Sequence, residues 1–471
     1  MAAKAMEVSS MKGFQGILHH PKNDGKGDYQ IRKGMVTTNM TPRMPVKSFT
    51  EKPAPSINKR HEDYLLTYPV DVAHSAIKLV YIELTVPARL IGPESADLFR
   101  IRWCDNLLHN YFKRIIFEID KNPIDLFDSS WLDDHLQWFT ARQAGPFADR
   151  DVGNLNQLTD WNCYLPEKKI KMVIPFFFHR NKAPFPLFFF RRKFNEILIQ
   201  VEKRIDLNDL LKAEFLDSKD GVWKPFNKKK TLETILTKND DPIDPMIEIH
   251  YQDYAQEEIS KIIDQTKKEP YLYYLTRPIS KKIIHEDKSV PVHTEYPVLA
   301  LFGKCTPYKY ADNKDYSSYS TSHREPFVEE KPIIKQIDIS SEKYNESMSV
   351  DKANSCFNLE FFPSLPRKAG YIAVPIEEGW SHTGISTGKI FEKDLSISLN
   401  VTLNDEEGID GEPVLASAED AYKSLLEESG KNTSERKKNY IFMYNLLIQQ
   451  VLRWKYNSQE SDTFTFEVSP P

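Results

Sequence analysis

Two His-Glu-Asp triplets, at residues 61–63 and 285–287, are the patterns in this sequence best suited to hold a reactive metal. A histidine beside a carboxylate can begin the set of two histidines and one carboxylate that binds non-haem iron, and His293 and His323 follow the second triplet. Such a site needs side chains that converge from inward-facing strands, whereas both triplets stand in charged, loop-like stretches. They therefore indicate solvated surface, and the sequence predicts no metal site and no cofactor.

A second pattern with catalytic potential, G-x-S-x-G, occurs at residues 384–388. A nucleophile elbow needs a strand before it and a helix after it, but the alternating stretch Lys393–Leu403 predicts a strand after it. The pattern therefore indicates a turn between strands. The phosphate-binding patterns G-x-x-x-x-G-K-[ST] and G-x-G-x-x-G do not occur in the sequence. No catalytic residue is predicted, and the chain is not expected to be an enzyme.

Two acidic clusters could offer oxygen ligands to calcium, but neither completes an EF-hand loop, so both are interpreted as solvated loops. They are Asp240, Asp241 and Asp244, and residues 404–407. The N-terminus has no apolar stretch after a basic start, so no secretory signal is expected. The N-x-[ST] sequons are therefore expected to be unmodified. They lie at Asn39, Asn345, Asn400 and Asn432.

Length and composition bound the kind of protein. The 471 residues suit two sizeable domains with tails. Lys and Arg number 63 against 68 Asp and Glu, a formal charge of -5, which argues against direct binding of nucleic acid. The mean hydropathy of -0.52 is typical of a soluble protein. Four widely spaced cysteines fit neither a zinc site nor a disulfide scaffold and favour a reducing compartment.

The elements that would position any site are predicted to be mainly strands. Residues 1–60 have little periodicity and are predicted to form an extended arm, or a solvated tail. Two β-rich halves follow, joined by a helix over Tyr254–Lys268 whose isoleucines have helical spacing. A short helix is also predicted over Ala418–Glu428 with Ser417 as its N-cap. The predicted strands are Ile77–Val86, Ile115–Ile119, Lys169–Phe178, Ile197–Val201, Met246–Tyr251, Ile333–Ile339, Lys393–Leu403 and Thr463–Val468.

An aromatic-rich stretch, Ile174–Leu211, carries seven phenylalanines between residues 176 and 190. Rings of this kind dominate core burial, so a sandwich core is favoured over a membrane-dipping or ligand-stacking loop. The segment Phe185–Phe190 is also a candidate for an exposed loop at an interface.

Three segments in order resemble signature regions of the major capsid proteins of nucleocytoplasmic large DNA viruses, of the iridovirus, phycodnavirus and marseillevirus kind. Phe99–Phe139 is similar to the "W-x-x-x-L-x-H-x-x-I-K" region, Ile174–Leu211 to the "P-L-P-F-F-F" region, and Ile247–Ile263 to the phrase that ends the first jelly roll. A looser similarity covers Asn439–Lys455. The matching positions are Trp103, Leu107, His109, Phe112, Lys113, Glu118, Ile119, Ile124, Asp125, Pro175, Phe176, Phe177, Phe178, Phe194, Asn195, Glu196, Ile197, Ile199, Glu257, Glu258, Tyr444, Asn445, Leu447, Leu452 and Arg453.

The resemblance implies an all-β fold with a few short helices, a double jelly-roll of two eight-stranded antiparallel β-sandwiches in tandem. It places the arm at 1–60, the first jelly roll at 61–253, a linker helix at 254–269 and the second jelly roll at 270–471. It implies that Trp103, His109 and Trp131 are packing and capping residues.

In function, the resemblance implies a structural capsid protein of the virion, assembled in the host cytoplasm. Homotrimers would form pseudo-hexameric capsomers that tile the icosahedral shell of a double-stranded DNA virus. Expected partners are neighbouring capsomers, minor capsid proteins under the shell and, through these, an internal membrane. The alternatives are a minor capsid or scaffold protein of the same virus class, or a soluble jelly-roll lectin or metal-dependent oxygenase, which would need convergent polar residues in one sandwich mouth.

Overall fold

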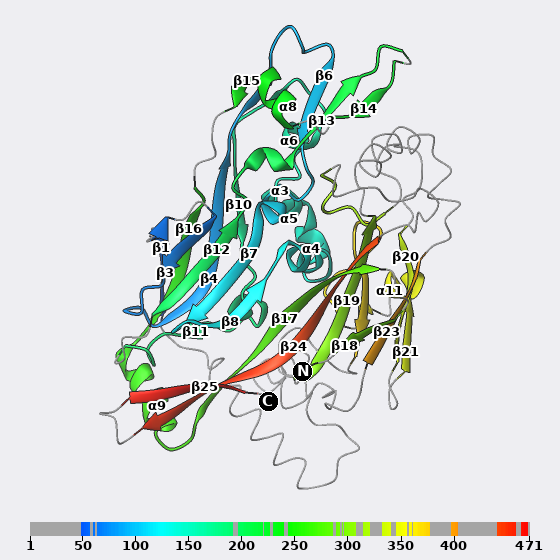
Figure 1. The fold of residues 1–471 in the computed structure, drawn as a ribbon. Helices are drawn as coiled ribbons and strands as arrows, with labels where there is room; N and C mark the ends of the chain where they lie inside the picture. The colour runs from blue at the N-terminus through cyan, green and yellow to red at the C-terminus, as the bar shows by residue number, and fades with distance from the viewer. Residues whose placement is uncertain are drawn as a thin grey trace, which may run out of the picture.

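The computed structural model in Figure 1 describes residues 49–469 except 57–59, 62–63, 192–195, 220, 227–228, 240–243, 286–288, 293, 295, 308–313, 321–331, 341–344, 356–357, 360, 377–396, 404–439 and 458–462. The described residues form antiparallel strands with short helices between them. Most strands assemble into two β-sandwiches that follow each other along the chain.

The first sandwich has eight main strands. In chain order they are β1 (Phe49–Ser56), β3 (Leu65–Pro69), β4 (Ala76–Val86), β7 (Phe112–Ile119), β8 (Asn122–Phe127), β10 (Lys168–Val173), β12 (Ile197–Lys203) and β16 (Met246–Tyr254). One sheet has the order β1-β16-β4-β10 and the other β3-β12-β7-β8. Counted along the chain, these orders are 1-8-3-6 and 2-7-4-5, the arrangement of a jelly roll made of two Greek keys.

The second sandwich repeats this order. Its strands are β17 (Tyr271–His285), β18 (Ser289–Val292), β19 (Val298–Pro307), β20 (Ile334–Ser340), β21 (Asn345–Ser349), β22 (Ile372–Pro375), β23 (Ile397–Leu403) and β24 (Tyr440–Asn457). The sheets are β17-β24-β19-β22 and β18-β23-β20-β21, again 1-8-3-6 and 2-7-4-5. The predicted double jelly-roll of two eight-stranded sandwiches is therefore confirmed.

Further short strands and helices decorate this frame. Two three-stranded sheets extend the first sandwich at the top of Figure 1, in the orders β14-β13-β6 and β15-β5-β9. Their strands are β5 (Arg89–Ile91), β6 (Phe99–Trp103), β9 (Tyr164–Leu165), β13 (Leu211–Leu216), β14 (Trp223–Pro225) and β15 (Leu236–Asn239). β2 (Arg60–His61), β11 (Phe185–Pro186) and β25 (Thr463–Ser469) pair with β3, β4 and β24. The main helices are α3 (Leu107–Tyr111), α4 (Ser129–Trp138), α5 (Gly145–Asp151), α6 (Asn156–Thr159), α7 (Phe177–Arg180), α8 (Lys229–Ile235), α9 (Gln256–Thr266) and α11 (Val350–Ala353).

Alternation of apolar and polar residues specifies the strands. In β4, Val80, Ile82 and Leu84 are buried while Tyr81 and Glu83 keep partial exposure, as a sheet with one face on a core requires. The other predicted strands also occur, most with shifted ends, while residues 393–396 of the strand predicted at Lys393–Leu403 lie outside the described residues. Helix α9 occupies most of the predicted junction helix.

One predicted strand is wrong at its end. The alternation expected over Lys169–Phe178 stops at Val173, and Phe177–Arg180 is helical. Pro175 has no N–H to donate to a ladder, and the Phe177 N–H instead donates to the Asp125 carboxylate at 2.9 Å. The sequence pattern could not show this distant acceptor.

Strand β1 lies inside the range predicted as an arm. It pairs with β16 over its whole length, from Phe49 with Tyr254 to Ser56 with Ile247. Pro53 and Pro55 suit this position because β1 is an edge strand, where a missing N–H can face away from the ladder. The domain boundaries stay a prediction, and β1 argues for ending the arm at residue 48. The G-x-S-x-G pattern and the helix predicted at Ala418–Glu428 lie outside the described residues.

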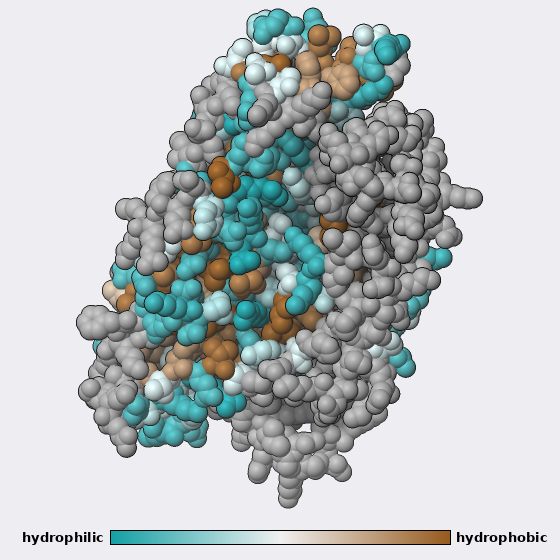
Figure 2. All heavy atoms as spheres, in the orientation of Figure 1, coloured by the Kyte–Doolittle hydropathy of each residue, from teal (hydrophilic) through white to brown (hydrophobic). Residues whose placement is uncertain are grey.

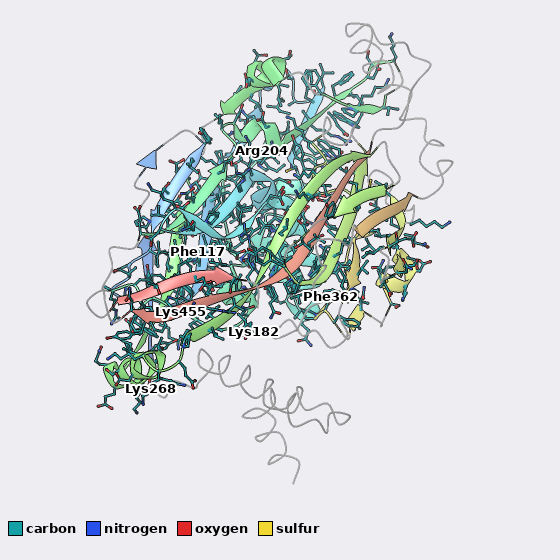
Figure 3. The ribbon with its side chains drawn as sticks, turned by 60° about the horizontal axis from the view of Figure 1, so that its bottom comes forward. Phe117, Lys182, Arg204, Lys268, Phe362 and Lys455 are labelled. Carbon is teal, nitrogen blue, oxygen red and sulfur yellow. The ribbon has the colours of Figure 1, made fainter. Side chains whose placement is uncertain are left out.

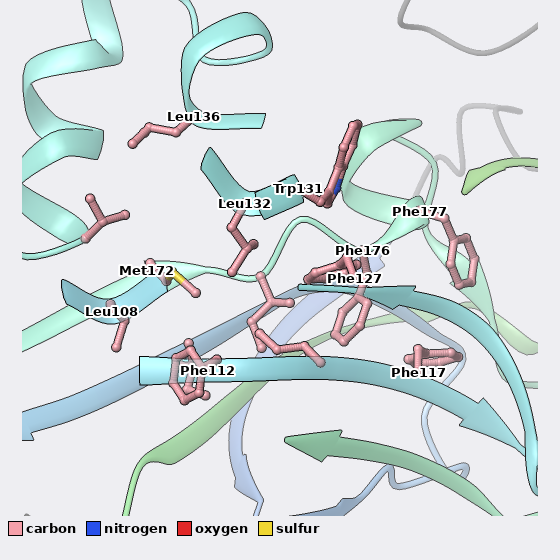
Figure 4. Packing of buried hydrophobic residues seen from close by; sticks show 14 of the residues in the cluster. Leu108, Phe112, Phe117, Phe127, Trp131, Leu132, Leu136, Met172, Phe176 and Phe177 are labelled. Atoms are coloured by element: carbon pink, nitrogen blue, oxygen red, sulfur yellow. The ribbon is translucent and has the colours of Figure 1, made fainter. Parts of the chain in front are cut away.

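The aromatic stretch forms core, as predicted. Phe117 on β7 contacts four rings at centroid distances of 5.4–5.7 Å, and Figure 4 shows it with Phe127, Phe176 and Phe177 between the strands. The rings around Phe117 are Phe176, Phe177, Phe178 and Phe185.

The segment Phe185–Phe190 is not an exposed loop, which corrects that expectation. Its phenylalanines are at most 5% exposed. Phe189 stacks on Trp454 of β24 at 5.2 Å and meets Phe464 of β25 edge-on at 5.0 Å. The rings are buried because the second jelly roll covers them.

Candidate functional site: the charged junction between the two jelly rolls

Helix α4 carries the polar residues that join the two jelly rolls. It begins where the Asp128 side chain accepts the Trp131 N–H at 3.1 Å, a standard N-cap. Its indoles Trp131 and Trp138 are fully buried and pack on Phe302 of β19. Figure 1 shows α4 between the first sandwich and strands β17, β24 and β19 of the second. The helix contacts β7 and β8 of the first roll as well as β17 and β24 of the second, so it lies between the two rolls.

Asp134 and Lys304 form a fully buried ion pair across the junction. The Lys304 Nζ lies 2.8 Å from the Asp134 carboxylate, and the two side chains are 0% and 1% exposed. The ammonium also donates to the Ser130 carbonyl and lies 5.2 and 5.5 Å from the rings of Tyr319 and Tyr371. Burial raises the pKa of Asp134 to about 6, although the Lys304 charge opposes this. Asn445 of β24 donates to the same carboxylate.

The neighbouring Asp133 collects hydrogen bonds from both rolls. It accepts from the His109 Nδ1 at 2.7 Å and the Asn106 Nδ2 at 2.8 Å, both in the first roll, and from the Tyr319 hydroxyl at 2.9 Å. Burial pushes its pKa up, but the His109 hydrogen bond and charge, with Lys304, outweigh burial and lower the pKa to about 2. Asp133 is therefore an ionised, fully bonded acceptor.

A third buried carboxylate fixes α7 against strand β17. The Arg180 Nη1 lies 3.0 Å from Asp125, and the Arg180 guanidinium also donates to the Thr276 carbonyl on β17. Asn181 donates to the Tyr274 carbonyl at 2.7 Å. Burial raises the pKa of Asp125, and Arg180 opposes the rise. The bonds from Arg180 and Asn181 end on backbone carbonyls of β17, so they fix the position of the strand itself.

A further set of contacts joins the rolls near the two small sheets. The Arg204 guanidinium lies 4.6 Å from the centre of the Tyr316 ring, and Lys212 pairs with Asp315. Figure 3 labels Arg204 on the first roll and Phe362 on the second, where Phe362 packs on Trp138 at 5.2 Å. The junction is therefore wide, and polar and aromatic contacts alternate across it.

Two histidines also lie in this junction. His135 and His179 have ring centroids 6.4 Å apart, and Arg180 follows His179 directly. Burial, then nearby positive charge, lowers the pKa of His179 to about 4 and that of His135 well below its usual value. Both rings are therefore neutral at pH 7.

Most of the residues considered for chemistry lie outside the part of the chain that the structure describes. His61 and His285 have described backbones in β2 and β17, while His293, His323, Asp240 and Asp241 lie outside the described residues. Asp244 pairs with Lys203 at 2.9 Å. Among the described residues, no three histidine, cysteine or acidic side chains gather to hold a metal ion.

Other reactive or modifiable groups also have simple surroundings. Burial raises the pKa of the Cys104 thiol to about 12, so it stays protonated at neutral pH, and Cys104, Cys163 and Cys305 are free thiols. The sequon residue Asn345 is exposed at the start of β21. Within the described part of the chain, no helix is both long and apolar enough to cross a membrane.

Sequence reasoning gave packing roles to Trp103, His109 and Trp131 and matched Asp125 and Asn445 to the signature regions, but it predicted none of the buried pairs of the junction. Trp103 and Trp131 are indeed fully buried and His109 bonds Asp133. A usable signal existed in Lys304, the one charged residue in the apolar stretch from Val298 to Cys305. A lysine inside a buried strand must be paired, so it predicts an acidic partner elsewhere in the chain.

The arrangement holds two folded units in one orientation. Its central ion pairs, Asp134 with Lys304 and Asp125 with Arg180, are buried, which suits positioning. Two jelly rolls of the same strand order, locked in tandem, define the class of double jelly-roll proteins.

Solved structures with this fold include viral capsid proteins. The crystal structure of PBCV-1 VP54, as fitted into a reconstruction of the virophage Sputnik, matches with a TM-score of 0.62 at 11% identity over 90% of this chain and 97% of that one. A quasi-atomic model of the PBCV-1 virus capsid gives 0.59 at 10% identity, over 90% and 97%. The Faustovirus major capsid protein gives 0.58 at 7% identity, over 86% and 90%. No sequence model of a protein family matches the chain, and no curated protein matches it by sequence.

Replacing Lys304 by methionine should strongly destabilise the protein, because Asp134 would remain buried without its cation. We expect the free energy of unfolding to fall by about 3–5 kcal/mol, measured by urea unfolding. The double variant Lys304→Met with Asp134→Leu should recover most of this loss. The matched control is Lys455→Met, which breaks an exposed ion pair with Glu467 and should cost less than about 1 kcal/mol. Equal losses in the two single variants would contradict the buried-pair interpretation.

His179 should make the protein less stable in acid. Its folded pKa lies below the unfolded value of 6.5, so its contribution is fully present above pH 6.5 and is lost as the pH falls toward 4. His179→Gln cannot take up this proton. The variant should therefore lose less stability than the wild type between pH 6.5 and 4, measured by thermal unfolding in a pH series. Parallel curves for the two proteins would rule out this role of His179.

Proposed function

We propose that this chain is the structural major capsid protein of a large double-stranded DNA virus. Three copies would form a capsomer with a pseudo-hexagonal outline, and many capsomers would tile an icosahedral shell. The observation that carries the proposal is the double jelly-roll itself, with identical strand order in both rolls, shared with solved capsid structures over most of each chain.

The charged junction supports this proposal on physical grounds. A shell protein acts through repeated contacts, and these keep their register only if each building block holds its shape. Buried ion pairs such as Asp134 with Lys304, together with the rings around Phe302, fix the angle between the rolls. Three copies of a rigid two-roll block would give six similar sides, as close packing in a shell requires.

The surface is compatible with many moderate interfaces. In Figure 2, hydrophobic residues on the described part of the first jelly roll stand in small groups among hydrophilic ones. Permanent interfaces bury roughly 2,000 Å² or more, with an apolar centre and polar rim. We place the protein in the virion shell, assembled in the host cytoplasm. Its partners would be neighbouring capsomers and minor capsid proteins, which link it to an internal membrane, without direct contact to nucleic acid.

The oligomeric state in solution tests this proposal directly. The purified full-length chain should have the mass of a trimer, three times 54.8 kDa, by light scattering or mass photometry. Electron micrographs of the same sample should show particles with a six-sided outline. A protein that stays a monomer at every concentration tested would contradict the proposal.

The N-terminal arm should act in assembly more than in folding. We propose that residues 1–48 tether neighbouring capsomers or minor proteins along the inner face of the shell. Deleting residues 1–48 should leave the trimer and its melting temperature unchanged but reduce shell formation. The deletion must stop before Phe49, because β1 pairs with β16. Deletion of residues 1–56 is the control that should impair folding, and normal shells from the shorter deletion would disprove the tether.

A further inference from the structure

Lys304 and Asp134 meet in the way that formation of an amide bond requires. The Lys304 Nζ lies 2.8 Å from the Asp134 Oδ1, and the two side chains are 0% and 1% exposed. Groups held about 3–3.5 Å apart react as if at a concentration far above any reached in free solution. Since Oδ1 is bonded to the carboxyl carbon, the nitrogen also lies close to the carbon that it would attack.

The nitrogen approaches the carboxylate outside hydrogen-bond geometry. Among the described residues, the Asp134 Oδ1 has no hydrogen-bond partner, although the Lys304 Nζ is its near neighbour. The nitrogen donates instead to the Ser130 carbonyl, and it lies over the rings of Tyr319 and Tyr371. The Ser130 carbonyl therefore holds Nζ in place while Oδ1 accepts no hydrogen bond.

The other oxygen of the same carboxylate has a donor in place. The Asn445 Nδ2 donates to the Asp134 Oδ2 and, at 3.2 Å, to the Ser130 hydroxyl. When an amine adds to a carboxyl carbon, negative charge develops on an oxygen, and a preorganised N–H in a buried site stabilises this charge. Asn445 is therefore positioned to act as an oxyanion donor.

Burial favours the uncharged form of the pair. If one proton moves from the ammonium to the carboxylate, the pair becomes an amine and a carboxylic acid, which cost less to bury than two ions. Burial raises the pKa of Asp134 to about 6, despite the nearby Lys304 charge. The uncharged amine has the lone pair that a nucleophile needs.

We propose that Lys304 and Asp134 react to form an isopeptide bond, which links the two jelly rolls covalently within one chain. Strand β19 of the second roll would then be joined to helix α4 of the first. The structure describes the pair before this bond forms. The bond would form whether or not the chain builds a shell.

The reaction is a condensation that needs no oxidant and no second reactant. The Lys304 Nζ adds to the Asp134 carboxyl carbon, a C–N bond forms, and the bond from that carbon to Oδ1 breaks. One N–H proton passes to the departing hydroxyl, which leaves as water. Oδ2 stays as the amide oxygen and keeps its hydrogen bond from Asn445.

Other ion pairs in the described part of the chain are less suited to this reaction. Lys212 and Asp315, for example, are 10% and 14% exposed, so water can solvate the ammonium and keep it charged. Arg180 and Asp125 are as well buried, but a guanidinium keeps its proton and is no nucleophile. Among the described residues, the junction pair alone combines full burial with a nitrogen that can lose its proton.

Mass spectrometry of the denatured full-length chain tests for the bond. The wild type should be lighter than its sequence by one water molecule, whereas Lys304→Met should have the full mass of its own sequence. A tryptic digest should contain the Lys304 peptide joined to the Asp134 peptide, and trypsin should no longer cleave after Lys304. Because the chain is denatured for the measurement, the wild-type result does not depend on how well the variant folds.

The rate of bond formation tests the role of Asn445. The joined fraction is followed by mass after a pulse of synthesis. Loss of one preorganised oxyanion donor slows a reaction about 100-fold or more, so Asn445→Ala should join at a rate reduced by this factor. The matched control is Asn181→Ala, a buried asparagine of the same junction that donates to the Tyr274 carbonyl instead of to Asp134. Its rate should stay within about twofold of wild type.

Two results would overturn the proposal. One is a wild-type chain of full sequence mass with Lys304 in an unlinked peptide, which would leave the junction with an ion pair only. The other is a missing water that fragmentation assigns to a different residue, such as a succinimide at another aspartate. Neither result bears on the proposed function, which is tested by the mass of the trimer in solution.

Discussion

The ammonium group of Lys304 is fully buried, and this constrains the whole molecule. A buried charge is tolerated only if it is paired and hydrogen-bonded. The groups that satisfy it come from both jelly rolls: Asp134 and the Ser130 carbonyl from the first, and the rings of Tyr319 and Tyr371 from the second. Neither roll can complete this environment alone. The two sandwiches are therefore one structural unit, although each has its own set of eight strands.

The apolar and polar parts of the junction have separate tasks. The rings of Trp131, Trp138 and Phe362 around Phe302 supply buried area, which is not directional. The ion pairs and the bonds from Arg180 and Asn181 to β17 carbonyls are directional, and they exclude neighbouring arrangements that would bury similar area. The relative orientation of the rolls is thus set by a few ion pairs and hydrogen bonds, whereas the buried apolar area holds the rolls together.

Much of the fold could be predicted from local pattern, because a strand such as β4 shows its two faces in its own residues. The prediction failed where the deciding partner is distant. Phe177 becomes helical because Asp125, in another strand, accepts its N–H. Pro53 and Pro55 look like a tail until β16 provides a ladder on one side only. The local pattern around Asp133 and Asp134 does not show their partners His109, Lys304 and Tyr319, because these lie far away in the chain.

Phe189 and Phe190 pack against Trp454, Phe464 and Phe466 near the C-terminus. This packing has a consequence for synthesis on the ribosome. The first jelly roll leaves the ribosome well before the strands that cover these rings. At about 5–20 residues per second, more than ten seconds separate the two events. During that interval the nascent chain exposes an apolar aromatic surface to which other proteins in the cell can bind. Rapid production of this protein therefore creates a demand for chaperones that grows with the number of chains in translation.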